Sequence, residues 1–231
     1  TPTTPATLEY LGGFFYQYVQ DRRANPRDDV LTELATATYP DGSLPDMLEA
    51  VRLAVFLFAA GQDTSAKLLG NAMRRIADTP ALQQQLRGNP GLIPSFLEEV
   101  LRLEGSTKAT FRLARRKTRI GEFEVPAGKR VVVALAAANR DPRRWDEPPE
   151  FRFDRPRIRE HLAFGRGVHT CIGAPLARAE VRVILEHFLR HTSAISLSEE
   201  KHGKPGNRRL DYEPSFIIRG LANLHVELAG K

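Results

Sequence analysis

The stretch AFGRGVHTCIG, residues 163–173, holds the only cysteine of the chain, Cys171, together with three glycines and a histidine. Glycines allow tight turns and let backbone N–H groups point inward. Pro175 follows two residues after the last glycine and suits the first turn of a helix, which we predict over 175–191. Amides near a helix N-terminus favour negative charge and would hold the sulfur as a thiolate. We therefore expect a loop and helix that present one sulfur.

The chemistry of a lone sulfur has several interpretations. A single cysteine is most often a small buried apolar side chain. A thiolate without a second thiol nearby is either a nucleophile or a ligand of one metal centre. Zinc is disfavoured, because no further cysteine exists and the histidines are scattered. The residues of the loop alone leave the nucleophile and the metal ligand open.

The segment FGRGVHTCIG resembles the heme-binding loop of the cytochrome P-450 family, Phe-x-x-Gly-x-x-x-Cys-x-Gly. The resemblance implies that Cys171 is the axial ligand of heme b (iron protoporphyrin IX) and favours O–O cleavage. It also implies that Phe164 packs against the sulfur side of the heme and that Gly165 belongs to the cofactor-binding turn. Gly173 would let the next helix approach the porphyrin.

Two further side chains are implied as heme-propionate ligands. His169 resembles the histidine that bacterial members use for this purpose; its alternative is an ordinary surface histidine. Arg112 follows Arg102 by ten residues and is similar to the family arginine that pairs with a propionate. Its alternative is a surface arginine on a strand.

A second unusual stretch is AAGQDTS, residues 59–65, inside a long helix predicted over about 45–77. The middle of this helix is apolar on all sides, so we expect it to run through the core. Gly61 costs about 1 kcal/mol relative to alanine in a helix interior. By itself the stretch is compatible with a kink and a satisfied polar pair.

This stretch resembles the cytochrome P-450 motif Ala-Gly-x-Asp/Glu-Thr, which lines the oxygen pocket. The resemblance implies that Ala60 and Gly61 leave room for O2. It assigns Thr64 a hydrogen bond to the bound oxygen and Asp63 a part in relaying protons from solvent. A hydroxyl beside a titratable carboxyl is suited to deliver protons through water.

The segment LEEVLRLEG places Glu99 and Arg102 three residues apart on a helix predicted over about 91–103. Such pairs are usually surface interactions. The segment resembles the Glu-x-x-Arg helix of the family, whose pair is joined by a later arginine in a buried structural network. The segment EFRFDRPR supplies the candidates: Arg155, which we choose, and its competitors Arg152 and Arg157.

The fold class that these patterns predict is mainly α with small β-sheets, and it corresponds to the C-terminal heme-binding part of the cytochrome P-450 fold. Amphipathic helices are expected over 6–23, 27–38 and 81–87, a small sheet over about 107–135, and a terminal hairpin. Residues 1–231 are expected to form a single, incomplete domain that lacks the N-terminal half of the family. A fragment, a truncated product, or a chain that pairs with a second chain would each explain this.

The composition is that of an ordinary globular protein: 231 residues, 42% hydrophobic and 27% charged. The longest apolar run, 53–60, is too short to cross a bilayer. The start of the sequence lacks a secretory pattern, and one cysteine forms no internal disulfide; both indicate a cytoplasmic location. The formal net charge of +6 is compatible with a solvated basic face or with a docking surface for an acidic protein. Both interpretations are favoured over nucleic-acid binding.

The resemblance implies a heme-thiolate monooxygenase of the soluble bacterial type. It would insert one oxygen atom from O2 into a small apolar organic substrate, with electrons from a ferredoxin or flavodoxin-like donor. Three basic residues near the loop would face that donor: Arg166, Arg178 and Arg182. The alternatives are a truncated, non-catalytic remnant that acts through protein contacts, and a heme sensor or carrier.

Overall fold

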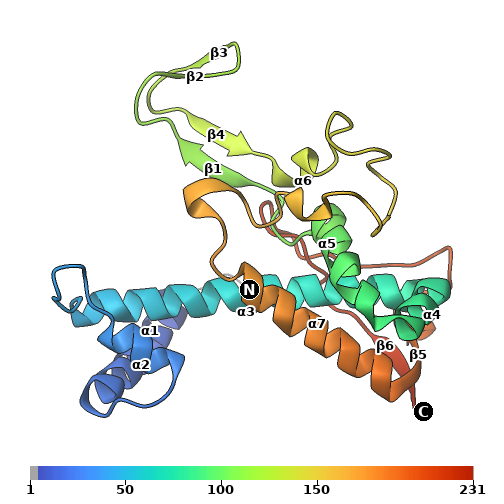
Figure 1. The fold of residues 1–231 in the computed structure, drawn as a ribbon, viewed down its shortest axis with the longest axis horizontal. Coiled ribbons are helices and arrows are strands. Elements are labelled where there is room, and N and C mark those ends of the chain that lie inside the picture. Colours follow the sequence, from blue (N-terminus) through green and yellow to red (C-terminus); the bar gives the residue numbers. More distant parts are fainter. Residues whose placement is uncertain (1–4, 231) are drawn as a thin grey trace. The chain divides into compact units, whose positions relative to one another are not determined.

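The computed structural model describes residues 5–230, with side chains from residue 9 onward. The chain is mainly helical with three two-stranded sheets in the described part (Figure 1). It divides into two compact units, of which the first ends at Asp63 and the second begins at Thr64. Among the described helices, none combines the length and the apolar character needed to cross a membrane.

The first unit contains α1 (Pro5–Ala24), α2 (Val30–Thr36) and the first part of α3 (Met47–Asp78). The side chain of Asp29 accepts a hydrogen bond from the backbone N–H of Thr32 at 2.7 Å and caps α2. This cap explains why α2 begins three residues later than the predicted range of 27–38. A small cluster of buried apolar residues holds the helices together: Val19, Ala35, Ala50 and Val51.

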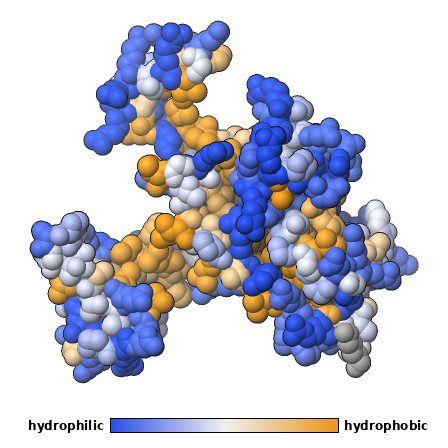
Figure 2. Space-filling view, in the orientation of Figure 1, coloured by the Kyte–Doolittle hydropathy of each residue, from blue (hydrophilic) through white to orange (hydrophobic). Residues whose placement is uncertain are grey.

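The prediction that the middle of α3 is buried is wrong for the part of the helix around Leu53 and Phe56. Phe56 is 64% exposed and Leu53 is 47% exposed. Figure 2 shows hydrophobic residues at the surface in the region of α3 and near the β1–β4 strands. The physical reason is that the small core of the first unit covers only one side of the helix.

The second unit is built around four helices. It holds the rest of α3, then α4 (Pro80–Gly88), α5 (Ile93–Glu104) and α7 (Ala174–His191), and a short 3-10 turn, Pro90–Leu92, precedes α5. The predicted bounds of α4, α5 and α7 differ from these by one or two residues. One apolar core joins all four helices, and its buried members include Leu68, Ile76, Leu86, Phe96, Val100, Val181 and Leu185.

The predicted small sheet consists of two separate antiparallel pairs. β1 (Thr110–Leu113) pairs with β4 (Arg130–Val133), and β2 (Thr118–Ile120) pairs with β3 (Phe123–Val125). The short helix α6 (Leu135–Ala138) follows. Between α6 and α7 the chain is irregular apart from the 3-10 turns Ile158–Glu160 and Gly167–His169.

The terminal hairpin expected from the sequence is reduced to a single antiparallel bridge between Tyr212 and Leu221. The last strand, β6 (Val226–Gly230), pairs instead with β5 (Thr192–Leu197), which directly follows α7, and α8 (Glu199–His202) lies between them. Ile195 and Leu197 of β5 are buried in the core, which anchors β5, and the edge of β5 pairs with β6.

Candidate functional site

The loop around Cys171 is closed by backbone hydrogen bonds. The N–H of Cys171 donates to the carbonyl of Phe164 at 2.9 Å, and the N–H of Gly165 donates to Leu162 at 3.0 Å. Gly165 and Gly167 have φ values of +70° and +83°, which L side chains rarely adopt. The glycines therefore allow the chain to turn back on itself before the sulfur.

The sulfur itself lies at the surface. Cys171 is exposed, so it is not the small buried apolar side chain that a lone cysteine often is. α7 begins three residues later, and the N–H of Ala174 donates to the carbonyl of Cys171 at 3.3 Å. A Cβ added at Gly173 would lie 3.8 Å from the sulfur, an ordinary contact distance. The loop thus presents one accessible thiol beside a helix N-terminus.

The other residues of the predicted heme site occupy different environments. Phe164 is half-buried and packs against the core of the second unit. His169 and Arg112 are exposed, and among the described residues neither pairs with a carboxylate. Arg112 lies on β1 opposite Val131 and donates to the carbonyl of Phe111 at 2.9 Å. The structure does not join these two side chains into one cluster.

The residues of the AAGQDTS stretch lie within α3. Ala60, Gly61 and Asp63 are exposed, whereas Thr64 is half-buried. A Cβ added at Gly61 would meet no heavy atom within 4 Å. No close contact in the described structure therefore requires a glycine here, and the helix continues through the stretch without a break.

A buried ion network lies between α5 and the irregular segment that follows α6. Both side chains of the Glu99–Arg102 pair are fully buried, and Arg102 donates Nε and Nη2 to the two carboxylate oxygens at 2.7 Å each. Arg155 donates Nε to Oε1 of Glu99 at 3.0 Å. Arg152 contributes its backbone N–H at 2.8 Å, while its side chain pairs with Glu147. The carboxylate of Glu99 is therefore surrounded by donors.

The two arginines of this network use their remaining donors on backbone carbonyls. Arg102 donates Nη1 to Asn139 and Pro148, both at 2.9 Å. Arg155 donates Nη2 to the carbonyls of Glu147 and Glu150 at 2.8 and 2.7 Å. Trp145, the only tryptophan, stacks with its ring 5.3 Å from the Arg102 guanidinium. The network thereby fixes an irregular chain segment, which is how buried charges become tolerable.

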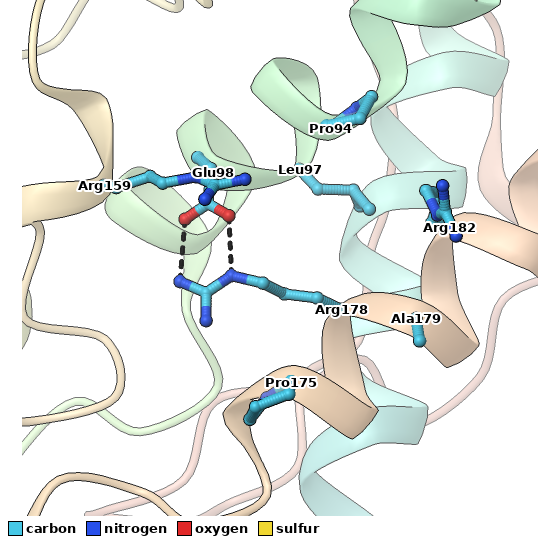
Figure 3. Close-up of a pocket in the computed structure, with 8 residues that line it drawn as sticks. All are labelled: Pro94, Leu97, Glu98, Arg159, Pro175, Arg178, Ala179 and Arg182. Atoms are coloured by element: carbon cyan, nitrogen blue, oxygen red, sulfur yellow. Dashed lines mark hydrogen bonds and ion pairs between the residues drawn. The ribbon is translucent and has the colours of Figure 1, made fainter.

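A second buried cluster was not predicted from the sequence. Glu98, which is 3% exposed, accepts hydrogen bonds from Arg178 of α7 at 2.6 and 2.9 Å (Figure 3). The Nδ1 atom of His161 accepts from the N–H of Ala163, so Nε2 carries the proton and donates to Glu98 at 2.9 Å. Burial raises the pKa of Glu98, but the hydrogen bonds from His161 and Arg178 outweigh it and lower the pKa to about 2.

This cluster corrects the role expected for Arg178. Instead of facing an electron donor, its guanidinium is committed to Glu98 and lies 4.6 Å from the ring centre of Phe164. The signal for this cluster in the sequence is weak, because Glu98 is separated from His161 by 63 residues and from Arg178 by 80. A second acidic residue beside Glu99 on an amphipathic helix was the one available hint.

A third cluster anchors the end of α5 to α3. Glu104 accepts from Nη2 of Arg74 at 2.5 and 2.6 Å and also pairs with Arg75. Burial raises the pKa of Glu104, but its attraction to Arg75 and Arg74 outweighs this and holds the pKa below the usual range. Asn71 donates to the carbonyl of Glu104 at 2.7 Å and caps the same helix end.

The fold and the loop define a mainly helical protein that carries one cysteine-bearing turn ahead of a helix. The family model described as cytochrome P-450 matches residues 91–208, which include the buried ion network and the cysteine loop. The chain belongs to the cytochrome P-450 family, whose members typically bind heme and act as monooxygenases.

Individual relatives agree with this assignment. Cytochrome P-450 144 of Mycobacterium tuberculosis is 42% identical over 219 residues, which are 95% of this chain and 48% of the relative. Among solved structures, substrate-free CYP150A6 of Mycobacterium marinum is 52% identical with a TM-score of 0.93, over 97% of this chain and 55% of that one. CYP109E1 of Bacillus megaterium in complex with corticosterone is 28% identical with a TM-score of 0.87, over 97% of this chain and 58% of that one.

In each of these matches, this chain is covered almost completely but the relative only in part. The chain spans about half the length of the curated relatives it matches. The mainly helical fold with small sheets therefore corresponds to part of the fold of those proteins.

Proposed function

We propose that this chain forms the thiolate-bearing part of a heme-thiolate monooxygenase that inserts one oxygen atom from O2 into a small apolar organic substrate. The observation that carries the proposal is the exposed sulfur of Cys171, held on a glycine turn directly before α7. A buried thiol at this position would have been inert, whereas an exposed one can bind a metal.

The residues present fit heme better than a metal ion without its own chelate. In the described part of the chain, no group of three or more His, Cys, Asp or Glu side chains could hold a metal ion. A metal held by one protein sulfur needs most of its ligands from elsewhere, and a porphyrin supplies four of them. When bound, the heme supplies the redox chemistry that activates O2.

The loop residues have separate tasks in this proposal. Cys171 is the axial ligand, and Phe164 covers the sulfur side of the heme b plane. Gly165 permits the turn, while Gly173 keeps the start of α7 free of a side chain. His169 and Arg112 bind the propionates, a role that suits exposed hydrogen-bond donors without a carboxylate partner among the described residues.

The residues of α3 serve the oxygen side. Ala60 and Gly61 leave space there, in keeping with the absence of a heavy atom within 4 Å of a Cβ built at Gly61. Asp63 and Thr64 are consecutive in α3, which suits a carboxyl and a hydroxyl that pass protons from solvent to the oxygen side. The Glu99–Arg102–Arg155 network has a structural task and keeps the segment before the cysteine loop in place.

The electron donor is proposed to be an acidic ferredoxin or flavodoxin-like protein. Arg166 and Arg182 are exposed and remain candidates for its docking surface, whereas Arg178 is occupied by Glu98. Steering by charge is weakened by salt, so reduction of the heme by such a donor should slow as ionic strength rises.

The test of the cofactor is spectral. Reduced protein with carbon monoxide should show the strongly red-shifted Soret band of thiolate-ligated heme, and Cys171→Ala should abolish this band. Val168→Ala, in the same loop, is the matched control and should keep it, because Val168 is 97% exposed. A Cys171→Ala protein with an unchanged spectrum would refute the ligand assignment.

The test of the proton pathway is coupling. Thr64→Ala should retain heme but release peroxide in place of oxygenated product, whereas Thr118→Ala on the exposed strand β2 should not. Since CYP109E1 was solved with corticosterone and with testosterone, steroids are the first substrates to try. Equal coupling in wild type and Thr64→Ala would remove Thr64 from the mechanism.

A second candidate function follows from the exposed apolar surface. Phe56 and other large apolar residues are exposed, which suits a heme binder or a non-catalytic remnant that acts through protein contacts. A purified chain that gains no Soret band from added hemin would favour the remnant. A Soret band without turnover under a surrogate donor would favour the heme binder.

A further inference from the structure

A pocket of about 240 Å³ lies between α5 and α7, next to the 3-10 turn Ile158–Glu160 (Figure 3). Its charged lining consists of three arginines and one glutamate: Arg159, Arg178, Arg182 and Glu98. The rest of the lining is apolar, with Leu97 from α5 and Ala179 from α7 among it. All of these residues belong to the second unit.

One of the three arginines is neutralised inside the pocket. Arg178 and Glu98 form a two-point ion pair with N–O distances of 2.6 and 2.9 Å, and the donated proton of His161 completes the coordination of the carboxylate. The pair is drawn with dashed lines in Figure 3. Its net charge is zero, so the positive charge of the pocket comes from Arg159 and Arg182, of which Arg182 is partly balanced by Glu186.

Arg159 and Arg182 retain donors for a ligand. Arg159 is exposed, and in the described part of the chain no carboxylate pairs with it. Arg182 forms a loose, exposed ion pair with Glu186 of the same helix, in which Nε lies 3.9 Å from the nearest carboxylate oxygen and beyond hydrogen-bond distance. The two side chains come from different segments of the chain and line the same cavity. Each guanidinium can therefore present two parallel N–H groups to an anion.

We propose that this pocket binds the phosphate group of a small molecule. Arg159 and Arg182 both keep hydrogen-bond donors, and a phosphate with a charge of about −2 attracts them more strongly than a carboxylate with a single charge. Guanidinium groups fit the tetrahedral oxygens of phosphate with paired hydrogen bonds. The apolar walls at Leu97 and Ala179 suit the carbon part of a phosphate monoester. The ion pair of Arg178 and Glu98 forms a fixed polar surface beneath it.

This site shares Arg182 with the surface proposed for the electron donor but not with the proposed heme site. None of the residues proposed to hold heme or handle protons lines the pocket. Binding of phosphate can therefore be measured with or without heme, and its failure would leave the monooxygenase proposal untouched.

The experiment is a calorimetric titration of the protein with inorganic phosphate and with pyrophosphate, at constant ionic strength balanced by potassium chloride. The double variant Arg159→Gln/Arg182→Gln should bind at least about tenfold more weakly than wild type, a loss of about 1.4 kcal/mol. Arg116→Gln removes one exposed arginine outside the pocket and should leave the affinity unchanged. All three altered arginines are exposed, so folding is expected to survive, and circular dichroism checks it.

Acetate distinguishes a phosphate site from a carboxylate site. It should bind at least about tenfold more weakly than phosphate, because it carries a smaller charge and fewer acceptor oxygens for the two arginines. Acetate that binds as tightly as phosphate would overturn the assignment of phosphate and point to the carboxylate of an acidic partner. A double variant that binds phosphate as well as wild type would overturn the site itself.

Discussion

The buried carboxylate of Glu98 makes the stability of this protein depend on pH in a defined window. Glu98→Gln keeps the size of the side chain but removes its charge, so Arg178 loses its counter-ion. The pKa of Glu98 is about 2, compared with 4.5 for an unperturbed glutamate. At about 1.36 kcal/mol for each pKa unit, the folded state gains about 3 kcal/mol from ionised Glu98 at neutral pH.

The sign of the effect follows from the direction of the pKa change. A carboxylate with a depressed pKa stabilises the folded state above pH 4.5, and this contribution is lost as pH falls from 4.5 toward 2. We therefore expect wild type to exceed Glu98→Gln by about 3 kcal/mol at pH 7. The two proteins should converge as pH approaches 2, because protonated glutamate and glutamine carry the same charge.

The assay is urea unfolding followed by the fluorescence of Trp145, which is buried and is the only tryptophan. Free energies of unfolding for both proteins are compared at several pH values from 7 to 3, so that contributions of other groups cancel in the difference. The control is Glu124→Gln, whose exposed ion pair with Lys117 should contribute less than about 1 kcal/mol. A constant difference between wild type and Glu98→Gln across this range would refute the reasoning.

Three further changes test the packing that supports the site. Glu99→Gln leaves Arg102 and Arg155 buried without an anion and should lower the free energy of unfolding in urea by about 3–5 kcal/mol. The control Arg152→Gln changes a partly exposed side chain and should lower it by less than about 1 kcal/mol. Similar losses in the two variants would contradict a buried network. Gly220→Ala puts a Cβ into Cγ of Lys67, whose Nζ pairs with Glu213, and should cost about 1–3 kcal/mol in thermal unfolding. Gly70→Ala meets no atom within 4 Å and should instead stabilise α3 by up to about 1 kcal/mol, so a loss at both sites would argue against a steric cause at Gly220. Gln83→Leu removes both hydrogen bonds to the backbone of Ile195, at 2.8 and 2.9 Å. It should lower the free energy of unfolding by about 1–3 kcal/mol and speed hydrogen exchange at the amide of Ile195. The control Gln84→Leu changes an exposed side chain and should have neither effect.

Local patterns in the sequence predicted the helical part of the fold well. The ranges expected for α3, α4, α5 and α7 agree with the structure within about two residues. These elements have apolar residues at helical spacing and proline or glycine at their ends, and both signals act over a few residues. The pairing of the last strand was not predicted, because β5 and β6 pair across 28 intervening residues, a distance over which periodicity carries no information.

The candidate site divides in the same way. The glycine turn, the single cysteine and the following helix are contiguous, so the sequence by itself determined that a sulfur stands before a helix. Only the tertiary structure decided that this sulfur is exposed. It also decided that Glu99 accepts hydrogen bonds from the side chain of Arg155 and from the backbone N–H of Arg152. The pairing of Glu98 with Arg178 was likewise visible only in the tertiary structure. Contacts between residues 50 to 80 positions apart depend on the path of the whole chain, because burial and pairing arise where segments meet in space.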